Sequence, residues 1–230
     1  MFSKIDDYVL HLAGAFAGRH ELFDKFVINI LDRYSFKLLP LTAMLIYIWS
    51  REDEKRLART AVVEAVAGTL AAVAVSRLIQ NLSPLRLRPL HSGNPAFVAP
   101  IGTNTETLEH WSSFPSDHAA LSFALSTAIW HFSRPLGALS YAWSVLIVCL
   151  PRIYAGYHYA SDALGGAVVG VGAVLCVRLL LPTEAVAGRA SSLAARYPGP
   201  FNAAMFILMF FFTTMFEDIR LVFYALLKRV

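Results

Sequence analysis

The sequence predicts an all-α protein, a polytopic bundle of about six transmembrane helices with an amphipathic N-terminal helix. Of the 230 residues, 57% are hydrophobic and only 16% are charged, whereas soluble domains carry about 25% charged residues. The apolar residues also fall in blocks separated by charged or polar connectors, which is the arrangement of membrane helices and their loops. We therefore expect residues 1–230 to form one integral membrane domain.

The N-terminal region, residues 1–35, is expected to lie at the membrane surface. Apolar positions within 5–18, and again within 21–35, recur at helical spacing with polar residues between them. This pattern is typical of interfacial amphipathic helices. Charged residues precede the first apolar run, so we expect no cleavable signal peptide and a first membrane helix that stays attached.

Six apolar blocks are the expected membrane spans. They cover roughly 36–50, 60–81, 115–132, 136–151, 162–181 and 201–216. Several are shorter than the ~20 residues that a full crossing needs, so flanking residues must complete them. We expect a bend at Pro40 in the first span. In the fifth span, Gly166 and Gly170 form a GxxxG pair that allows close helix packing.

The connectors differ in character. Residues 51–59 are densely charged, and residues 182–200 form a polar connector with Pro and Ser. The segment 82–114 contains four prolines and is too broken for a regular element. Because loops of this length are often functional, its residues 90–113 are a candidate guide for a lipid, and a plain connector is the equal alternative.

The charge distribution excludes some functional classes. The net charge of +4 at pH 7 comes from cations between the apolar blocks, and no soluble domain offers the basic face that nucleic acid requires. Cys149 and Cys176 each lie inside an apolar block without a Cys or His at metal-ligand spacing. We therefore expect no nucleic acid, no structural disulfide and no zinc site.

Three short motifs at the ends of predicted spans carry Arg, His, Ser and Asp side chains. They are Arg88-Pro89 with Arg77 and Arg86 upstream, Phe114-Pro115-Ser116-Asp117-His118, and the stretch from Arg152 through His158 to Asp162. Taken singly, each has a plain structural interpretation as an interface anchor, a helix cap or a pair on one helix face. If the spans alternate in direction, all three motifs reach the same membrane face, a convergence that separate structural roles do not predict.

Together, these side chains suit the binding of a phosphate group. The guanidinium groups of Arg88 and Arg152 can each bind phosphate oxygens through two parallel hydrogen bonds. Ser116 and the free backbone N–H groups at the start of the third span add donors where a helix dipole favours an anion. The further candidate phosphate-binding residues are Asp117, Arg77 and Arg86.

Two histidines supply the groups that could attack the phosphorus and protonate the leaving oxygen. His158 can attack phosphorus while Asp162, four residues further on and expected on the same helix face, accepts a hydrogen bond from one ring nitrogen. His118 can protonate the leaving oxygen. The sequence offers no carboxylate cluster for magnesium or a metal pair, so we expect neither a metal nor a cofactor.

At these residues the chain resembles the type 2 phosphatidic acid phosphatase superfamily. That family shows Lys-x6-Arg-Pro, Pro-Ser-Gly-His and Arg-x5-His-x3-Asp elements in this order, and the resemblance covers residues 77–162. It implies a membrane lipid phosphatase in which His158 is the nucleophile and forms a phosphohistidine, with His118 as general acid and Asp162 as the orienting carboxylate. The phosphate ligands that it implies are Arg88, Ser116 and Arg152.

Two departures narrow the resemblance. Asn81 stands seven residues before Arg88, where the family often has Lys, and Arg77 or Arg86 is expected to compensate. Asp117 replaces the Gly of the second element. A Phe-Pro-Ser-Asp-His sequence resembles the branch that dephosphorylates undecaprenyl diphosphate, the recycled carrier of bacterial cell-wall synthesis, and members of that branch can also lack the Lys.

The leading hypothesis is therefore hydrolysis of undecaprenyl diphosphate to undecaprenyl phosphate, with the lipid phosphate and membrane lipids as partners. Phosphatidate, phosphatidylglycerol phosphate, lipid A or transfer to an acceptor other than water would suit the same motifs. A transporter using the intramembrane Glu64 and Arg178 and an inactive scaffold are alternatives from other classes. The pattern assigns no oligomeric state, and no role to residues 201–230.

The charge bias predicts the orientation. The cations expected on the face opposite the motifs are Arg51, Lys55, Arg56, Arg59, Arg134, Arg189 and Arg196. Positive charge marks the cytoplasmic side, so the motifs are expected at the periplasmic or outer surface of a bacterial inner membrane. The cations of residues 1–35 would then also lie outside, against the bias.

Overall fold

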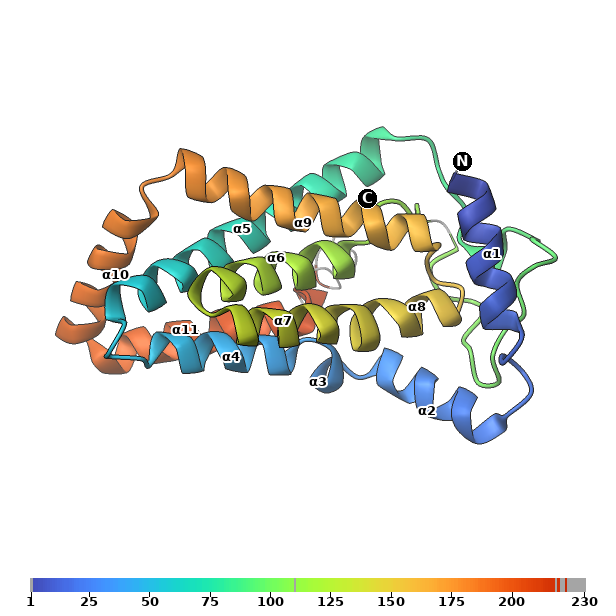
Figure 1. Cartoon of the computed structure of the whole chain (residues 1–230), viewed down its shortest axis with the longest axis horizontal. Helices are drawn as coiled ribbons and strands as arrows, with labels where there is room; N and C mark the ends of the chain where they lie inside the picture. The colour runs from blue at the N-terminus through green and yellow to red at the C-terminus, as the bar shows by residue number, and fades with distance from the viewer. Residues whose placement is uncertain (1, 110, 218, 220–221, 223–230) are drawn as a thin grey trace.

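The structure, a computed structural model, describes residues 2–109, 111–217, 219 and 222. In this part of the chain the regular structure is helical, without a strand, and the long helices run side by side (Figure 1). The predicted all-α class is confirmed. The helices are α1 (Phe2–Gly14), α2 (Glu21–Asp32), α3 (Tyr34–Lys37), α4 (Leu39–Trp49), α5 (Lys55–Leu82), η1 (Pro89–His91), α6 (Asp117–Phe132), α7 (Arg134–Trp143), η2 (Ser144–Cys149), α8 (Leu150–Tyr154), α9 (Ala160–Leu180), α10 (Thr183–Arg196) and α11 (Pro198–Thr214).

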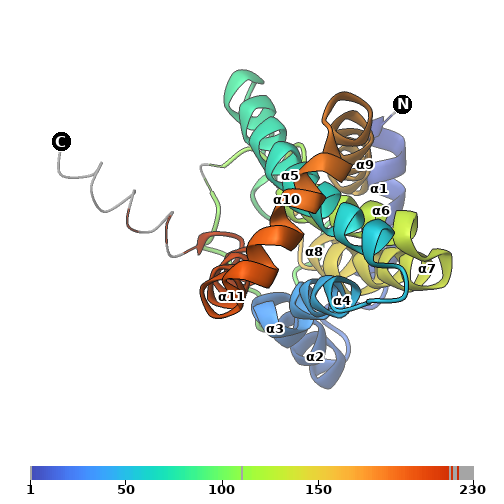
Figure 2. The ribbon, with the colours of Figure 1, turned by 90° about the vertical axis from the view of Figure 1, so that its left-hand side faces the viewer.

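Helix α6 is the centre of the bundle and packs against α5, α7 and α9 (Figure 2). Its sequence DHAALSFALSTAIWHF places small side chains on several faces, and small side chains let neighbouring helices approach closely. Ala119, Ala120, Ala124 and Ala128 have no exposed surface. The first turn of α6, which carries the second motif, is therefore held by its neighbours on several sides.

Three helices are long and apolar enough to cross a membrane, namely α5, the continuous helix Arg134–Tyr154 and α9. The apolar helices α4 and α11 are shorter. Helix α6 has 16 residues and rises only about 24 Å, against about 30 Å of bilayer hydrocarbon. The chain is a membrane protein, but the predicted number of six spans is not confirmed.

A π-helical segment, η2, joins α7 and α8 into one continuous helix that contains the predicted span 136–151. Within it, the Ser144 hydroxyl lies 3.0 Å from the Ser126 hydroxyl of α6. A π-helical turn holds more residues than an α-helical turn and so rotates the residues that follow. One of these residues is Arg152 of the third motif.

The close packing predicted for the GxxxG pair is confirmed. A Cβ added to Gly166 of α9 would lie 2.3 Å from the carbonyl oxygen of Ser116, and one added to Gly170 would lie 2.2 Å from that of Ala120. Only glycine leaves room for these two backbones. The contact fixes the start of α9 against the start of α6, where the second and third motifs lie.

Three predicted boundaries were wrong. Residues 182–200 are not a plain connector, because α10 occupies most of them, packs against α5 and pairs its Glu184 with Arg56. Helix α5 begins at Lys55, inside the predicted charged connector. The first apolar block breaks at Leu38 rather than bending at Pro40, since a proline is accommodated in the first turn of α4.

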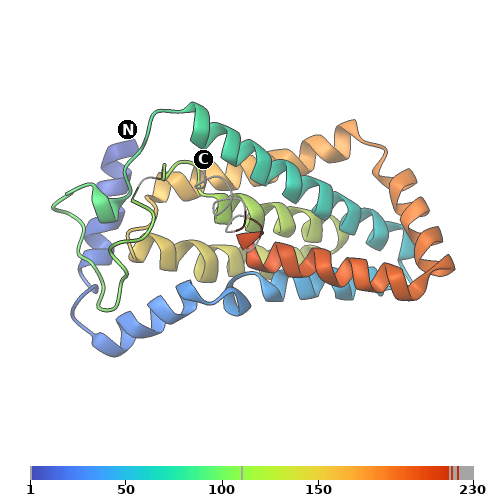
Figure 3. The ribbon, with the colours of Figure 1, turned by 180° about the vertical axis from the view of Figure 1, so that it is seen from behind.

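The two predicted N-terminal helices are present, and they cover one end of the bundle (Figure 1). Helix α1 contacts α8 and α9, and α2 contacts α8. Buried Asp24 of α2 ties this end together, since it accepts hydrogen bonds from the backbone N–H groups of Gly18 and Ile101, both at 2.9 Å, and from the Tyr154 hydroxyl. At the back, α11 lies beside α4 (Figure 3).

Candidate active site

The three motifs meet at the end of the bundle that α1 and α2 cover. Helix α5 ends there and α6 begins there, while α8 ends and α9 begins beside them (Figure 1). The expected alternation of helix direction, and the convergence that it predicts, are confirmed. A cavity of about 550 Å³ lies at this end. Six of the candidate site residues line it: Arg77, Arg88, Asp117, His118, Arg152 and His158.

His158 is buried and lies just before α9, not within it. The expected shared helix face with Asp162 was therefore wrong. Its Nδ1 is 2.9 Å from the carbonyl oxygen of Ser113 and 3.7 Å from Asp162 Oδ2. A carbonyl only accepts, so Nδ1 carries the proton and Nε2 keeps its lone pair. This Nε2 lies 3.3 Å from Arg88 Nη1.

Asp162 has no exposed surface and does not line the cavity. Its Oδ2 accepts from the backbone N–H of Tyr159 at 2.7 Å, which caps the start of α9. Its Oδ1 accepts from Arg86 Nη1 at 2.5 Å. At 3.7 Å, the carboxylate is too far from the His158 ring for a normal hydrogen bond. It acts on that ring as a nearby negative charge and as the anchor of the turn that carries it.

Arg86 lies outside the set of cavity-lining residues. Besides Asp162, its guanidinium donates to the Ser161 hydroxyl at 2.9 Å and to Asp6 Oδ2 at 2.7 Å. Asp6 is buried and also accepts from the backbone N–H and hydroxyl of Ser161. These contacts tie α1 to the start of α9, and they engage both terminal nitrogens of Arg86 with groups of the protein.

His118, in the first turn of α6, is held at both ring nitrogens. Nδ1 donates to Asp117 Oδ1 at 3.1 Å, and Nε2 lies 2.5 Å from Arg152 Nη2. Because guanidinium nitrogens only donate, Nε2 is the accepting nitrogen in this arrangement. The Asp117 carboxylate can stabilise a positive charge on the ring when Nε2 is protonated.

Arg88 and Arg152 are both buried in the cavity wall, 6% and 7% exposed. Arg88 donates to the carbonyl oxygens of Tyr157 and Ser112, the latter at 3.3 Å. Among the described residues, the Nε groups of both arginines have no hydrogen-bond partner. Two guanidinium groups beside two imidazoles, with donors to spare, form a site suited to a tetrahedral anion.

Ser116 is the N-cap of α6 and is buried away from the cavity. Its hydroxyl accepts from the N–H of Ala119 at 3.4 Å, and its own N–H donates to the carbonyl of Asp162 at 3.0 Å. These contacts join α6 to α9. The phosphate-ligand role expected for Ser116 stays a prediction, and its hydroxyl is at present engaged as a cap.

Arg77 and Asp117 both line the cavity and form an ion pair with each other. Arg77 also donates to Gln80 Oε1 at 3.2 Å and lies over the Trp111 ring. Both Asp117 oxygens are taken up, one by Arg77 and one by His118. A carboxylate repels phosphate, so these contacts favour a positioning role for Asp117 over direct phosphate binding.

Part of the cavity wall comes from residues outside the three motifs. Helices α2 and α3 supply Asp32, Tyr34 and Lys37, the long loop supplies residues such as Asn104 and Trp111, and Glu217 comes from the C-terminal region. Lys37 stands at the edge of an apolar block, and a lysine in such a position is ordinarily an interface anchor. No group of three or more His, Cys, Asp or Glu side chains in the described ranges is placed to hold a metal ion.

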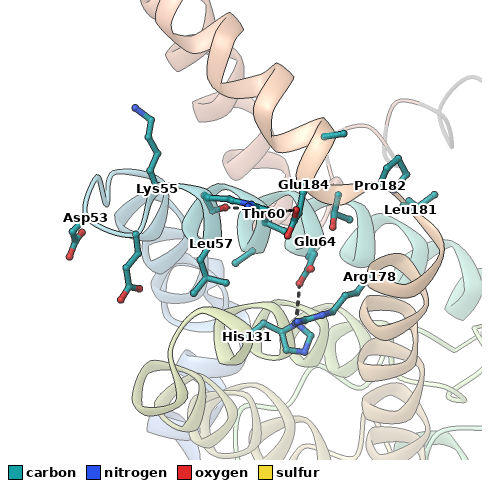
Figure 4. A pocket seen from close by; sticks show the side chains of 15 residues that line it. Asp53, Lys55, Leu57, Thr60, Glu64, His131, Arg178, Leu181, Pro182 and Glu184 are labelled. Carbon is teal, nitrogen blue, oxygen red and sulfur yellow. Dashed lines mark hydrogen bonds and ion pairs between the residues drawn. The ribbon is translucent and has the colours of Figure 1, made fainter.

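A second cavity, of about 1010 Å³, lies at the other end of the bundle. There, buried Glu64 of α5 accepts from His131 Nδ1 at 3.0 Å, and Arg178 Nη1 lies 3.9 Å from the same oxygen (Figure 4). The wall mixes acidic and basic side chains, including Glu54, Arg56 and Glu184. It therefore lacks the surplus of cations that a phosphate site requires.

Comparisons with known proteins agree with this geometry. Residues 88–185 match the model of the PAP2 superfamily. The chain is 31% identical over 155 residues to the "Bacitracin transport permease protein BcrC" of Bacillus licheniformis, covering 66% of this chain and 68% of that protein. It is 28% identical over 145 residues to the "Putative undecaprenyl-diphosphatase YbjG" of Escherichia coli strain K12, covering 62% and 66%. The crystal structure of Aquifex aeolicus LpxE shares the fold, with a TM-score of 0.50 and 21% identity over 75% of this chain and 93% of that one.

Proposed function

The chain belongs to the PAP2 superfamily, and from this premise we propose that it is a membrane lipid phosphatase that hydrolyses undecaprenyl diphosphate to undecaprenyl phosphate. The observation that carries the proposal is the meeting of two histidines and two buried arginines in one cavity wall. The name of YbjG supports the choice of substrate. Phosphatidate, phosphatidylglycerol phosphate and lipid A are the alternatives for the same site.

In the first step, the lone pair of His158 Nε2 attacks the terminal phosphorus. An N–P bond forms as the P–O bond to the lipid phosphate breaks, and protonated His118 gives its proton to the leaving oxygen. The hydrogen bond from Nδ1 to Ser113 presents the correct tautomer. Asp162, 3.7 Å away, stabilises the positive charge that develops on the ring.

In the second step, His118 takes a proton from water, and the resulting hydroxide oxygen attacks the phosphohistidine. The N–P bond breaks, orthophosphate leaves and His158 returns to its neutral form. Arg88 and Arg152 bind the equatorial oxygens and stabilise their charge in both transition states. These residues account for the reaction through proton transfer, nucleophilic attack and electrostatics.

Phosphate release by the purified protein in detergent and EDTA tests this function. We expect His158→Ala to lower the rate on the order of a thousandfold or more. We expect a radiolabelled diphosphate to leave an alkali-stable, acid-labile label on the wild type and none on His158→Ala. A wild-type release rate from His158→Ala would contradict the mechanism. A panel of the four lipids, compared by kcat/KM, tests the substrate.

The name of BcrC makes transport a second candidate function. Glu64 and Arg178 are the residues that the sequence offers for a transport path. In the structure these residues pair beside the second cavity, at the end of the bundle opposite His118 and His158. Glu64→Gln therefore separates the two functions. A phosphatase retains its release rate in this variant, and a transporter that uses Glu64 loses its activity.

We also propose that the candidate site faces the periplasm or cell exterior. Helix α10 places Arg189 and Arg196 at the opposite end of the bundle, together with the charged start of α5. Positive charge favours the cytoplasmic side. An outward site would meet a lipid diphosphate that is released after transfer of its glycan on the outer leaflet.

A further inference from the structure

Lys37 is a buried cation in the cavity wall that the proposed mechanism does not use. Its side chain is only 3% exposed and lines the cavity together with Arg88, Arg152, His118 and His158. Within the described residues, no carboxylate oxygen lies within 4.0 Å of its ammonium group. Its close contact is the face of the Tyr34 ring, 4.1 Å from Nζ to the ring centroid.

The fold holds Lys37 in this place rather than leaving it free. Lys37 ends the short helix α3, and the indole N–H of Trp143 in α7 donates to the carbonyl oxygens of Phe36 and Lys37, at 3.2 and 3.1 Å. The chain then breaks at Leu38 before α4 begins. A side chain with a fixed backbone and a ring beneath its ammonium group loses little further entropy when it binds an anion.

Burial of a cation without a paired anion is costly for the free protein. Two other basic side chains of this end differ from Lys37, because each has a carboxylate partner. Arg77 is paired with Asp117, and Arg86 is paired with Asp6 and Asp162. Asp32 and Glu217 line the cavity and interact with Lys37 only beyond ion-pair distance. An anionic ligand would supply the close partner that the protein does not.

The position of Lys37 indicates which part of a ligand it meets. Lys37 ends α3, which packs against η2, and η2 leads directly into α8 with Arg152. Arg152 Nη2 lies 2.5 Å from His118 Nε2, so Lys37 lies on the side of the proposed general acid. The general acid faces the leaving oxygen. When the leaving group is itself a lipid phosphate, its negative charge develops on this side of the cavity.

We propose that Lys37 binds the leaving phosphate of a lipid diphosphate and thereby makes the site selective for diphosphates over monophosphates. This inference rests on the proposed function and assigns a specificity-determining residue to it. Arg77 and Arg86, the residues expected to compensate for Asn81, are paired with carboxylates of the protein. Lys37, on a different helix, offers a cation without such a pair among the described residues.

The first test compares farnesyl diphosphate and farnesyl monophosphate as substrates of the full chain in detergent. We expect Lys37→Met to lower kcat/KM for the diphosphate on the order of 10- to 100-fold, the usual worth of a hydrogen bond to a charged group. The monophosphate value should change less than about threefold, and Lys37→Arg should retain most of the diphosphate activity. Equal losses on both substrates, or no loss on the diphosphate, would overturn the proposal.

The second test does not depend on turnover. In a His158→Ala background, we expect Lys37→Met to weaken binding of methylenediphosphonate about tenfold and to leave methylphosphonate binding unchanged. If wild-type protein released no phosphate from either lipid, the proposed function would fail, and this binding test would still decide the role of Lys37. Equal effects on both phosphonates would contradict it.

Thermal unfolding separates ligand binding from a structural role. Replacing an unpaired buried cation with methionine should leave the unfolding midpoint of the ligand-free protein unchanged or raise it. A lowered midpoint would mean that Asp32 and Glu217 hold Lys37 as a structural group. Lys25→Met is the matched control, because Lys25 is exposed and pairs with Glu21 on α2; it should alter neither activity nor binding.

Discussion

At the scale of single residues, the arginines of the first motif have different partners although only one residue separates them. Arg88 donates to carbonyl groups and lines the cavity, so a phosphate can compete for its donors. Arg86 is surrounded by the carboxylates of Asp6 and Asp162. The first is placed to bind a ligand, and the second holds charged groups of the protein together.

We therefore predict that Arg86→Met destabilises the protein and that Arg88→Met weakens anion binding. Without Arg86, two buried carboxylates lose their partner. We expect a cost of about 2 kcal/mol, below the roughly 3–5 kcal/mol for a fully buried pair, because the Arg86 side chain is 32% exposed. Thermal unfolding in detergent should show a midpoint several degrees lower, while methylphosphonate affinity measured below that midpoint stays at the wild-type value.

The double variant Asp6→Asn/Arg86→Met supplies the control. Removing the Asp6 charge should restore part of the lost stability if Arg86 serves to neutralise it. Arg88→Met should lose methylphosphonate affinity instead. If Arg86→Met kept the wild-type midpoint and lost anion affinity, Arg86 would be the phosphate ligand that the sequence first suggested.

Residue types and spacing were sufficient to predict that His118, His158, Arg88 and Arg152 share a site. They were not sufficient to predict the hydrogen-bond and ion-pair partners of these side chains. The Ser113 carbonyl that fixes the His158 tautomer lies 45 residues away in the chain, and any residue type carries such a carbonyl. Lys37 reaches the cavity because α3 ends beside it, which no motif encodes.

At the scale of elements, the contact between α6 and α9 sets the distance between the second and third motifs. The backbone carbonyls of Ser116 and Ala120 lie against Gly166 and Gly170. The Ser116 N–H also donates to the Asp162 carbonyl at 3.0 Å. A widened contact would move the two histidine-bearing turns apart.

We predict that Gly166→Ala and Gly170→Ala each destabilise the protein and lower phosphate release. A Cβ at either position would meet a backbone oxygen at 2.3 or 2.2 Å, and overpacking of this kind costs about 1–3 kcal/mol. Gly172→Ala is the control on the same helix, because a Cβ there meets nothing within 4 Å. Unfolding midpoints and kcat should remain near wild type in Gly172→Ala; equal losses in all three variants would point to helix propensity rather than packing.

A buried carboxylate, that of Asp24, contributes to the attachment of helix α2. Burial by itself raises the pKa of Asp24, but hydrogen bonds from Tyr154 and the N–H groups of Ile101 and Gly18 outweigh it, so the pKa lies below its ordinary value of 3.8. A depressed pKa stabilises the fold at pH values above the unfolded pKa, and this stability is lost as the pH falls through the folded pKa.

We predict that the wild type exceeds Asp24→Asn in unfolding midpoint at neutral pH and that the difference shrinks below about pH 4. Thermal unfolding at pH 7, 5 and 3 measures it. Asp7→Asn serves as the comparison for a carboxylate whose partner is the Asn94 amide. A difference that stays constant down to pH 3 would show that the charge of Asp24 contributes nothing to the attachment of α2.

Element prediction worked where apolar residues formed long runs or recurred at helical spacing, and it failed where neither pattern was present. The spans at α5 and α9 follow from hydropathy alone. Helix α10 was missed because its sequence TEAVAGRASSLAAR lacks a long apolar run; in the structure it packs against α5. The break at Leu38 was displaced from Pro40 because proline is tolerated in a first turn.

At the scale of the whole molecule, the bundle has two unlike ends. One end carries the candidate active site and the covering helices α1 and α2; the other carries α10 and the start of α5 (Figure 1). A membrane protein inserts in one direction, so the end that holds the site decides which leaflet supplies the substrate. Because α10 carries cations, we infer that its end of the bundle is cytoplasmic.

We predict that, in a background with Cys149→Ala and Cys176→Ala, Thr105→Cys reacts with a membrane-impermeant maleimide in intact cells and Ser192→Cys reacts only after permeabilisation. Thr105 is exposed on the loop at the site end, and Ser192 is exposed on α10. The reverse labelling would place the histidines in the cytoplasm. An outer-leaflet diphosphate would then be out of reach, and the substrate would have to be a lipid phosphate of the inner leaflet, so the labelling tests the substrate proposal as well as the orientation.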